Sequence, residues 1–130
     1  MLTIFKLIFP EFSHLNSFDY SQKEIVFRLV HEYGWLLTLV SDELKNDRDV
    51  VLNAVRNHGF SLEYASSDLK NDREIALAAV KQNANALKFV SDELKGDKQV
   101  VLNAVNQFGY ILEWASDGLK NDKEVVLNNK

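Results

Sequence analysis

Few residues of this 130-residue chain have the type and spacing that catalysis requires. Its histidines, His14, His31 and His58, occupy different positions of an internal repeat and share no helix face at metal-ligand spacing. Acidic pairs such as Asp42–Glu43 recur in a polar turn, which favours solvated loop charge over paired general acid–base carboxylates. Cysteine is absent, and so are a glycine-rich phosphate loop and a serine nucleophile elbow. We therefore predict no enzyme activity, no metal ligands and no cofactor.

Aromatic side chains are the residues that stand out from this background. At about 100° per residue, Phe60 and Tyr64 fall on the side of a short helix opposite Leu62 and Ala65. Either such rings wedge between adjacent repeats, or part of the stripe forms a semi-exposed groove for a peptide or partner helix, because Tyr and Trp are favoured interface anchors. The candidate partner-binding residues at these positions are Trp35, Phe60, Tyr64, Phe89, Tyr110 and Trp114.

A second surface comes from the outward positions of a longer helix in each repeat. These positions differ between copies, as they do on any solvated face, so they permit binding without indicating it. The two rows are Arg28, Asn53, Ala78 and Asn103, and His31, Arg56, Lys81 and Asn106.

The elements that position these residues belong to a repeat of about 25 residues. The unit LKNDRDVVLNAVRNHGFSLEYASSD starts at Leu44 and returns from Leu69 and Leu94, with a short copy from Leu119 and a divergent one from Ser21. The pattern predicts an all-α fold, a right-handed α-solenoid of tandem helix pairs with a longer helix A and a short helix B. Nearest-neighbour stacking is expected to stabilise it.

Helix A is expected to run from about Asp47 to His58, with an apolar arc of about 200° that suits a helix covered on several sides. Asn46 and Asn71 are the expected N-caps in a capping-box arrangement, and Gly96 should weaken the corresponding cap by a few tenths of a kcal/mol. Glycines at the end of helix A predict a left-handed C-terminal residue. They are Gly34, Gly59 and Gly109, and at Ala84 either Asn83 or Asn85 takes over or the turn is built differently.

Helix B is expected from Phe60 to about Ser66, with Leu62 and Ala65 facing helix A. A turn follows, either irregular or one helical turn capped by Ser41 and Ser91, and its leucines are expected to fill the gap between repeats. Its lysines are expected to approach a neighbouring repeat's Asp47-type residue, in pairs that contribute about 0–1 kcal/mol each. These lysines are Lys45, Lys70, Lys95 and Lys120.

The N-terminal residues 1–20 fit a degenerate capping half-repeat, followed by four tandem repeats and a partial C-terminal one over residues 21–130. Met1–Pro10 is about half the length of a membrane span and Lys6 interrupts it, so we expect neither an anchor nor a signal peptide. A net charge of −4 with alternating signs argues against nucleic-acid binding. The absence of cysteine fits a reducing compartment, and we expect the cytoplasm, with secretion as an effector of an intracellular bacterium as the alternative.

From Ser21 to its end, the chain resembles the DUF4116 repeats. Cap, A-V pair, glycine, an L-x-φ-A/V-S segment and L-K-x-D occur together, as in LKNDREIALAAVKQNANALKFVSDELK. The resemblance implies tandem helix pairs, and it carries no catalytic residues and no known function. From the residues themselves we expect a protein–protein interaction module that binds a peptide or partner helix on its aromatic surface. The alternative is a structural spacer or a fragment of a longer array; the partner's identity and the oligomeric state stay open.

Overall fold

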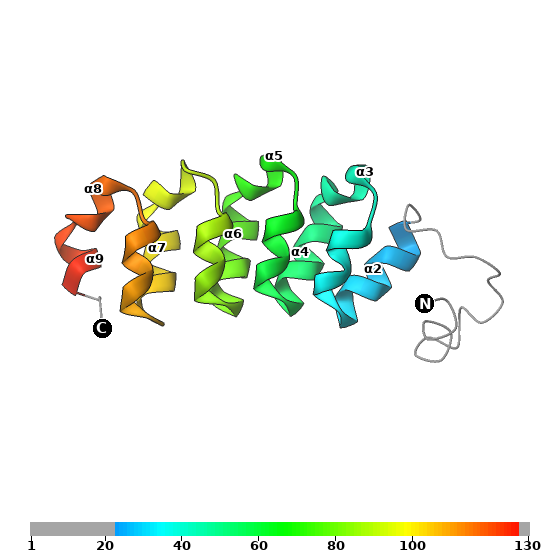
Figure 1. Ribbon diagram of the computed structural model, residues 1–130, viewed down its shortest axis with the longest axis horizontal. Helices are drawn as coiled ribbons and strands as arrows, with labels where there is room; N and C mark the ends of the chain where they lie inside the picture. Colours follow the sequence, from blue (N-terminus) through cyan, green and yellow to red (C-terminus); the bar gives the residue numbers. More distant parts are fainter. Residues whose placement is uncertain (1–22, 128–130) are drawn as a thin grey trace.

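The computed structural model describes residues 23–127, and these form a single row of stacked helical repeats (Figure 1). Within this range every regular element is helical, which confirms the all-α prediction, while the right-handed sense stays a prediction. The predicted capping half-repeat at residues 1–20 lies outside the described residues. The longer α-helices are α2 (Lys23–Glu32), α4 (Arg48–Asn57), α6 (Arg73–Gln82), α7 (Lys98–Val105) and α9 (Lys123–Leu127).

The helices α2, α4, α6 and α7 are each followed by a 3-10 helix and then by a short linker helix. The 3-10 helices, which take the place of the expected helix B, are η2 (Gly34–Leu39), η3 (Gly59–Tyr64), η4 (Ala84–Phe89) and η6 (Gly109–Trp114). The linker helices are α3 (Asp42–Lys45), α5 (Ser67–Lys70), η5 (Leu94–Gly96) and α8 (Asp117–Lys120). As predicted, Ser41 caps a linker helix: its Oγ accepts from Leu44 N at 3.3 Å. Ser91 Oγ accepts from Leu94 N at 3.2 Å, but the N-cap of η5 is Glu93.

The long helices begin one residue later than the sequence suggested. The N-cap is Asp47, whose Oδ1 accepts from Val50 N at 3.2 Å, and Asp72, Asp97 and Asp122 repeat this bond. The predicted caps Asn46 and Asn71 are wrong. Each instead ends a linker helix, where its Oδ1 accepts from a serine hydroxyl of the next repeat at 2.6 Å. Gly96 therefore does not weaken the cap of α7, which Asp97 provides.

The wide apolar arc expected for the long helix is present. Val50, Val51, Ala54 and Val55 of α4 have no exposed surface, because the preceding and following repeats and η3 cover them. Leu62 and Ala65 of the same repeat are buried on one side of η3, as predicted. The core therefore runs continuously through the row of repeats, as it does in other solenoids.

The glycines that follow the long helices serve close packing and not a left-handed turn. No residue in the described range has a positive φ, so that prediction is wrong, for Asn83 as well. A Cβ on Gly59 would lie 2.5 Å from the carbonyl oxygen of Ala79, in the next repeat, and one on Gly34 would collide with Ala54 O. Gly59 N also donates to Gln82 Oε1 at 2.5 Å. Glycine is needed at Gly34 and Gly59 because η2 and η3 start against the end of the next long helix.

The repeat with alanine at this position is built differently. Ala84 is fully buried, and the long helix of the following repeat, α7, ends at Val105 after eight residues, whereas α4 and α6 have ten. Gln107 there donates its side-chain amide to Val80 O at 2.8 Å. The neighbouring helix end thus accommodates the extra methyl group.

Candidate functional site

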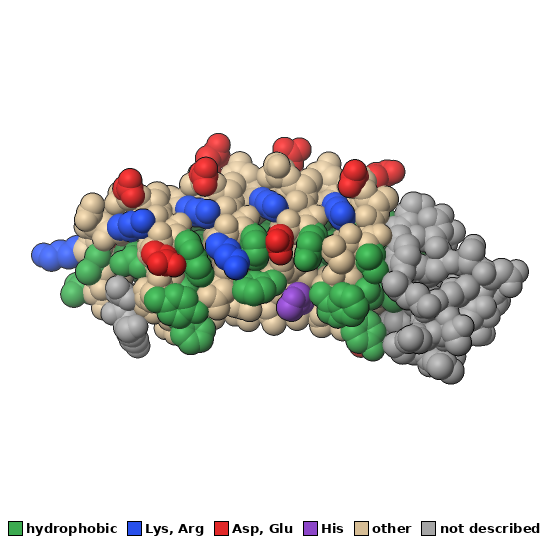
Figure 2. All heavy atoms as spheres, in the orientation of Figure 1, with side chains coloured by type: hydrophobic (Ala, Val, Ile, Leu, Met, Phe, Trp, Pro, Cys, Tyr) green, Lys and Arg blue, Asp and Glu red, His purple; other side chains and the backbone are tan. Residues whose placement is uncertain are grey.

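The six candidate aromatic residues lie on the side of the row formed by η2, η3, η4 and η6, which we call the 3-10 face. Hydrophobic side chains gather towards both ends of this face, with fewer between them (Figure 2). Trp35, Tyr64 and Tyr110 are exposed, at 53%, 38% and 58% of their surface. Phe60, Phe89 and Trp114 are half-buried against the core. The candidates therefore divide into three exposed rings and three rings that pack against the hydrophobic core.

The 3-10 geometry separates the rings that an α-helical wheel grouped together. With three residues per turn, Phe60 and Tyr64 lie about 120° apart, on the two flanks of the buried Leu62. Phe60 packs edge-on against Phe89 of the next repeat, with 5.6 Å between centroids. The ammonium group of Lys88 lies 5.3 Å and 5.0 Å from these two ring centroids, within cation–π distance. In the middle of the face, therefore, Phe60 and Phe89 pack against each other and the ammonium group of Lys88 lies over both rings.

The other end of the face holds the C-terminal aromatic cluster, which consists of Phe108, Tyr110 and Trp114. The Phe108 and Tyr110 centroids are 5.7 Å apart, and those of Tyr110 and Trp114 are 6.2 Å apart. Tyr110 donates its hydroxyl to Asn85 Oδ1 of the preceding repeat at 2.7 Å. The rings of Tyr110 and Phe108 are thus held in place although at least half of their surface is exposed.

Phe108 was missing from the sequence-based candidates, because it precedes the expected start of helix B. The equivalent positions hold Tyr33, His58 and Asn83, and His58 likewise makes an edge contact with Phe60, at 6.2 Å. The sequence signal that could have identified Phe108 is the ring or planar side chain that each repeat has at the residue before its 3-10 helix.

Each linker helix carries one lysine of what we call the lysine row, which consists of Lys45, Lys70, Lys95 and Lys120. Ser66 N donates to Lys45 O at 2.9 Å, and the same bond joins Ser91 to Lys70 and Ser116 to Lys95. Lys45, Lys70 and Lys95 therefore lie beside the C-terminal end of the following 3-10 helix. Figure 2 shows basic side chains in a row across the face, with hydrophobic groups on one side and acidic groups along the edge.

The lysine row does not pair with the Asp47-type residues, so that expectation is wrong. Lys95 and Lys120 approach Asp92 and Asp117 of their own linkers at 3.8 Å and 3.9 Å, and both carboxylates are fully exposed. Lys45 and Lys70 form no ion pair within residues 23–127.

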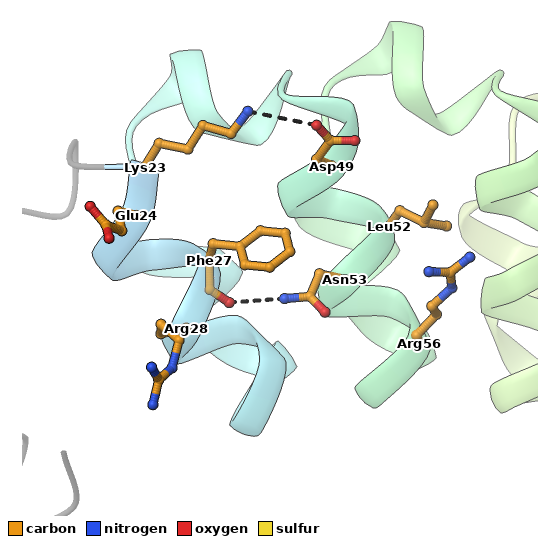
Figure 3. A pocket seen from close by; sticks show the side chains of 8 residues that line it. All are labelled: Lys23, Glu24, Phe27, Arg28, Asp49, Leu52, Asn53 and Arg56. Atoms are coloured by element: carbon orange, nitrogen blue, oxygen red, sulfur yellow. Dashed lines mark hydrogen bonds and ion pairs between the residues drawn. The ribbon is translucent and has the colours of Figure 1, made fainter.

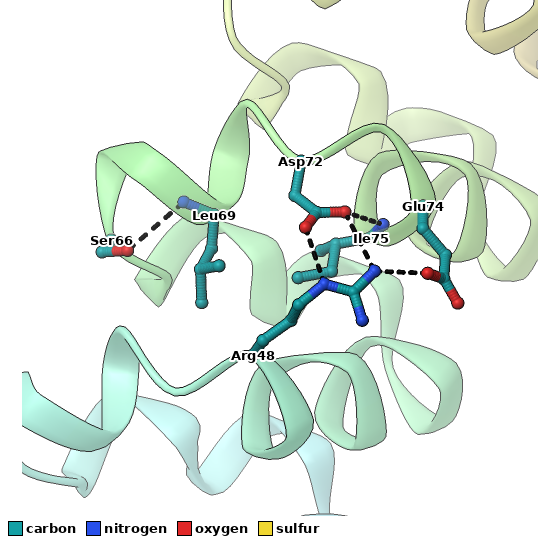
Figure 4. A network of polar contacts seen from close by, with 6 residues as sticks. All are labelled: Arg48, Ser66, Leu69, Asp72, Glu74 and Ile75. Carbon is teal, nitrogen blue, oxygen red and sulfur yellow. Dashed lines mark hydrogen bonds and ion pairs between the residues drawn. The ribbon is translucent and has the colours of Figure 1, made fainter.

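The Asp47-type residues pair with the cation at the first position of the preceding long helix. Arg48 of α4 reaches Asp72 at 2.8 Å and also binds Glu74 (Figure 4). Arg73 pairs with Asp97 at 2.8 Å, Lys23 with Asp47 at 3.0 Å and Lys98 with Asp122 at 3.3 Å. We call this series the inter-repeat ladder. It joins each helix N-terminus to the next and leaves the lysine row outside it.

The ladder shifts the protonation of its members. Partial burial alone would raise the pKa of Asp72, but hydrogen bonds from Arg48 and Ile75 N outweigh it, so the pKa lies below its ordinary value. The pKa values of Asp47 and Asp97 are lowered by the same balance. The pKa of Lys23 is raised, chiefly by its hydrogen bond to Asp47. All of these partners are structural neighbours, and the shifts mark a stabilising network.

The opposite side of the row carries shallow grooves between long helices. One, of about 780 Å³, lies between α2 and α4 and includes Phe27, Arg28, Asn53 and Arg56 in its lining. Another, of about 480 Å³, lies between α4 and α6 and includes Ala78 and Lys81.

The groups around the larger groove do not converge on one point. Figure 3 shows the ring of Phe27 between α2 and α4, whereas Leu52 and Arg56 lie on the far side of α4. Asn53 is engaged by Phe27 O at 2.9 Å and by His31 Nδ1 at 3.0 Å. Among residues 23–127, no group of three or more His, Cys, Asp and Glu side chains is placed to hold a metal ion. Over the same range, no helix is both long and apolar enough to cross a membrane.

Comparison with known proteins gives one family. The model of the DUF4116 family, a domain of unknown function, matches three times, over residues 22–69, 47–95 and 97–128. No curated protein and no solved structure matches the chain. The three matches cover most of the chain and follow the repeats described above.

Proposed function

The chain belongs to the DUF4116 family, and we propose that it is a non-catalytic protein–protein interaction module that binds an extended peptide segment of its partner on the 3-10 face. The observation that carries this proposal is the set of exposed aromatic rings on one side of the row of repeats. Trp35 and Tyr110 each expose more than half of their surface there, near opposite ends of the face.

The contacts around Tyr110 support its role as an anchor. Its ring touches Phe108 and Trp114, and its hydroxyl is held by Asn85, so little side-chain freedom remains to be lost on binding. A ring that is rigid, large and partly polar is the type of side chain that dominates interface energies.

The other side of the row is a weaker candidate. Its long helices α2, α4, α6 and α7 expose one large hydrophobic side chain, Phe27, at 39%. The nearby charges include both signs, with Lys23 3.7 Å from Asp49. The 3-10 face, by contrast, exposes Trp35 and Leu39 on η2, Tyr64 on η3 and Tyr110 on η6.

The test uses a displayed library of random peptides, each of about 12 residues, selected on the purified protein. Enriched peptides are then synthesised, and their affinities are measured for wild type and for Trp35→Ala, Tyr64→Ala, Tyr110→Ala and Trp114→Ala. We expect these changes to weaken binding more than they lower the melting temperature, with Trp114→Ala the most destabilising because its ring is half-buried.

Phe27→Ala is the matched control, since it removes an exposed ring from the opposite side. The proposal fails if enriched peptides respond to Phe27→Ala and not to the 3-10 face variants. Failure to enrich any peptide would favour the alternative, a structural spacer with no binding role of its own.

A further inference from the structure

The 3-10 face combines its exposed rings with the lysine row, whose cations lie outside the inter-repeat ladder. The cations of the long helices, such as Arg48, are engaged by half-buried aspartates of the ladder. Lys45 and Lys70 of the lysine row form no ion pair within residues 23–127, and the contacts of Lys95 and Lys120 are long. These lysines are half-buried on their aliphatic stems, which orients them.

We propose that the partner is an acidic segment in polyproline II conformation, with a carboxylate at every third residue facing the lysine row. This inference rests on the proposed function and adds to it the chemistry and the register of the bound peptide.

The register follows from two spacings. Packed helices of successive repeats are about 8–10 Å apart, and the lysine row has one member for each repeat. A polyproline II segment advances by about 9.3 Å in three residues, and every third side chain points the same way. A carboxylate at every third position therefore meets successive lysines, and about ten residues reach from Lys45 to Lys120.

The remaining side chains of such a segment fall over the aromatic rings. Two of every three residues point away from the lysine row, and apolar ones among them contact Trp35, the Phe60–Phe89 pair or the C-terminal aromatic cluster. Polyproline II peptides commonly bind to aromatic surfaces, because their backbone is ordered before binding.

Other charges on the face restrict where the carboxylates lie. Glu63 and Glu113 are exposed on η3 and η6 and repel a negative partner at the level of the rings. Lys88, in the equivalent position on η4, adds a positive charge over Phe60 and Phe89. Asp92 and Asp117 of the linkers lie beside Lys95 and Lys120 and also repel a negative partner, on the edge of the face. The partner's acidic groups are therefore expected on the ring side of the lysine row and, in the middle, near Lys88.

The experiment measures fluorescence anisotropy with three labelled peptides of about 12 residues. The first repeats Glu-Pro-Leu. The second has the same composition with its glutamates in adjacent pairs, and the third replaces each glutamate with lysine. Proteins are wild type, Lys70→Gln/Lys95→Gln, and the control Arg56→Gln/Lys81→Gln, which removes the same charge from the opposite side.

We expect the first peptide to bind wild type roughly fivefold or more tightly than the second peptide does. Its affinity for Lys70→Gln/Lys95→Gln should be lower than its affinity for wild type, whereas its affinity for the control variant should equal that for wild type. Affinity should also fall as NaCl rises from about 50 to 300 mM, a readout that requires no variant.

Three results would overturn the inference. They are equal affinity for the first two peptides, equal loss in the two protein variants, and no binding of the first peptide up to about 1 mM. If library-selected peptides still depended on Tyr110 in any of these cases, the 3-10 face would remain the docking surface and only its acidic polyproline II register would be wrong.

Discussion

At the scale of single residues, Asp72 shows how one side chain supports two repeats. Its carboxylate caps α6 through Ile75 N at 3.1 Å and accepts from Arg48 of the preceding repeat at 2.8 Å. We predict that Asp72→Ala lowers the free energy of unfolding by about 1–2 kcal/mol, mostly through loss of the cap. Asp72→Ser keeps a capping side chain and loses the ion pair, so it should recover most of the lost free energy of unfolding. Urea denaturation monitored by circular dichroism measures both.

Asp92→Ala is the matched control for Asp72, because Asp92 is fully exposed and caps no long helix. It should change stability by less than about 0.5 kcal/mol. If Asp72→Ser were as unstable as Asp72→Ala, the ion pair and not the cap would be the larger contribution.

A second residue-scale prediction compares two glycines. Gly59→Ala places a methyl group 2.5 Å from Ala79 O, so either η3 or the end of α6 must shift. We expect a loss of about 1–3 kcal/mol. At Gly118, in α8, a Cβ meets nothing within 4 Å and φ is not positive, so Gly118→Ala should be neutral or stabilise by up to about 1 kcal/mol. Differential scanning calorimetry of both variants checks this, and equal melting temperatures would contradict the packing explanation.

At the scale of elements, the repeat pattern predicted the stacked helices but not the type of the second helix. Both a short α-helix and a 3-10 helix bury Leu62 and Ala65 three residues apart, so the apolar spacing cannot separate them. The difference arises because η3 begins against the end of α6, where Gly59 N binds Gln82, and this contact is made between repeats. For the same reason the placement of Phe60 beside Phe89 could not be read from a single helical wheel.

The N-cap shows a similar limit. Asn46 and Asp47 are both good capping residues, and sequence preference alone does not choose between them. The structure assigns Asp47 to α4 because the linker helix uses Asn46 as its own C-terminal residue and as the acceptor for Ser66 Oγ.

The core contribution of the 3-10 helices can be tested at Leu87 of η4. Leu87 and Val55 have no exposed surface. We predict that Leu87→Ala and Val55→Ala cost roughly 2–5 kcal/mol, with the valine at the low end, because each leaves a cavity that neighbouring repeats cannot fill. Leu39→Ala, at an exposed position of η2, is the control and should cost much less. Wild-type urea midpoints for either core variant would refute this assignment of the core.

At the scale of the whole molecule, two series of cations with the same period have different roles. The sequence showed both, and it pointed to the lysine row as the partner of the Asp47-type residues. The structure instead pairs those aspartates with Lys23, Arg48, Arg73 and Lys98. The assignment depends on which end of a long helix lies beside the next, which the period alone does not determine. The consequence is that the lysine row lies outside the ladder, on the 3-10 face.

The ladder also makes the stability of the whole row depend on pH. The aspartates Asp47, Asp72 and Asp97 have pKa values below the ordinary 3.8, so the unfolded chain binds more protons than the folded one as the pH falls through this region. Their stabilisation is complete above about pH 5 and is lost progressively below about pH 4. Lys23 and Lys98 have raised pKa values, so their stabilisation persists through neutral pH and is lost only as the pH rises above 10.5.

We therefore predict a flat urea midpoint between about pH 5 and 9 and a decline from about pH 4 to 3. Asp72→Asn/Asp97→Asn should be less stable at pH 7 and should decline less steeply in acid, because two of the groups that release protons on folding are gone. Asp68→Asn/Asp92→Asn, at exposed linker positions, should keep the wild-type slope. An unchanged slope in the ladder variant would mean that carboxylates other than Asp72 and Asp97 govern acid unfolding.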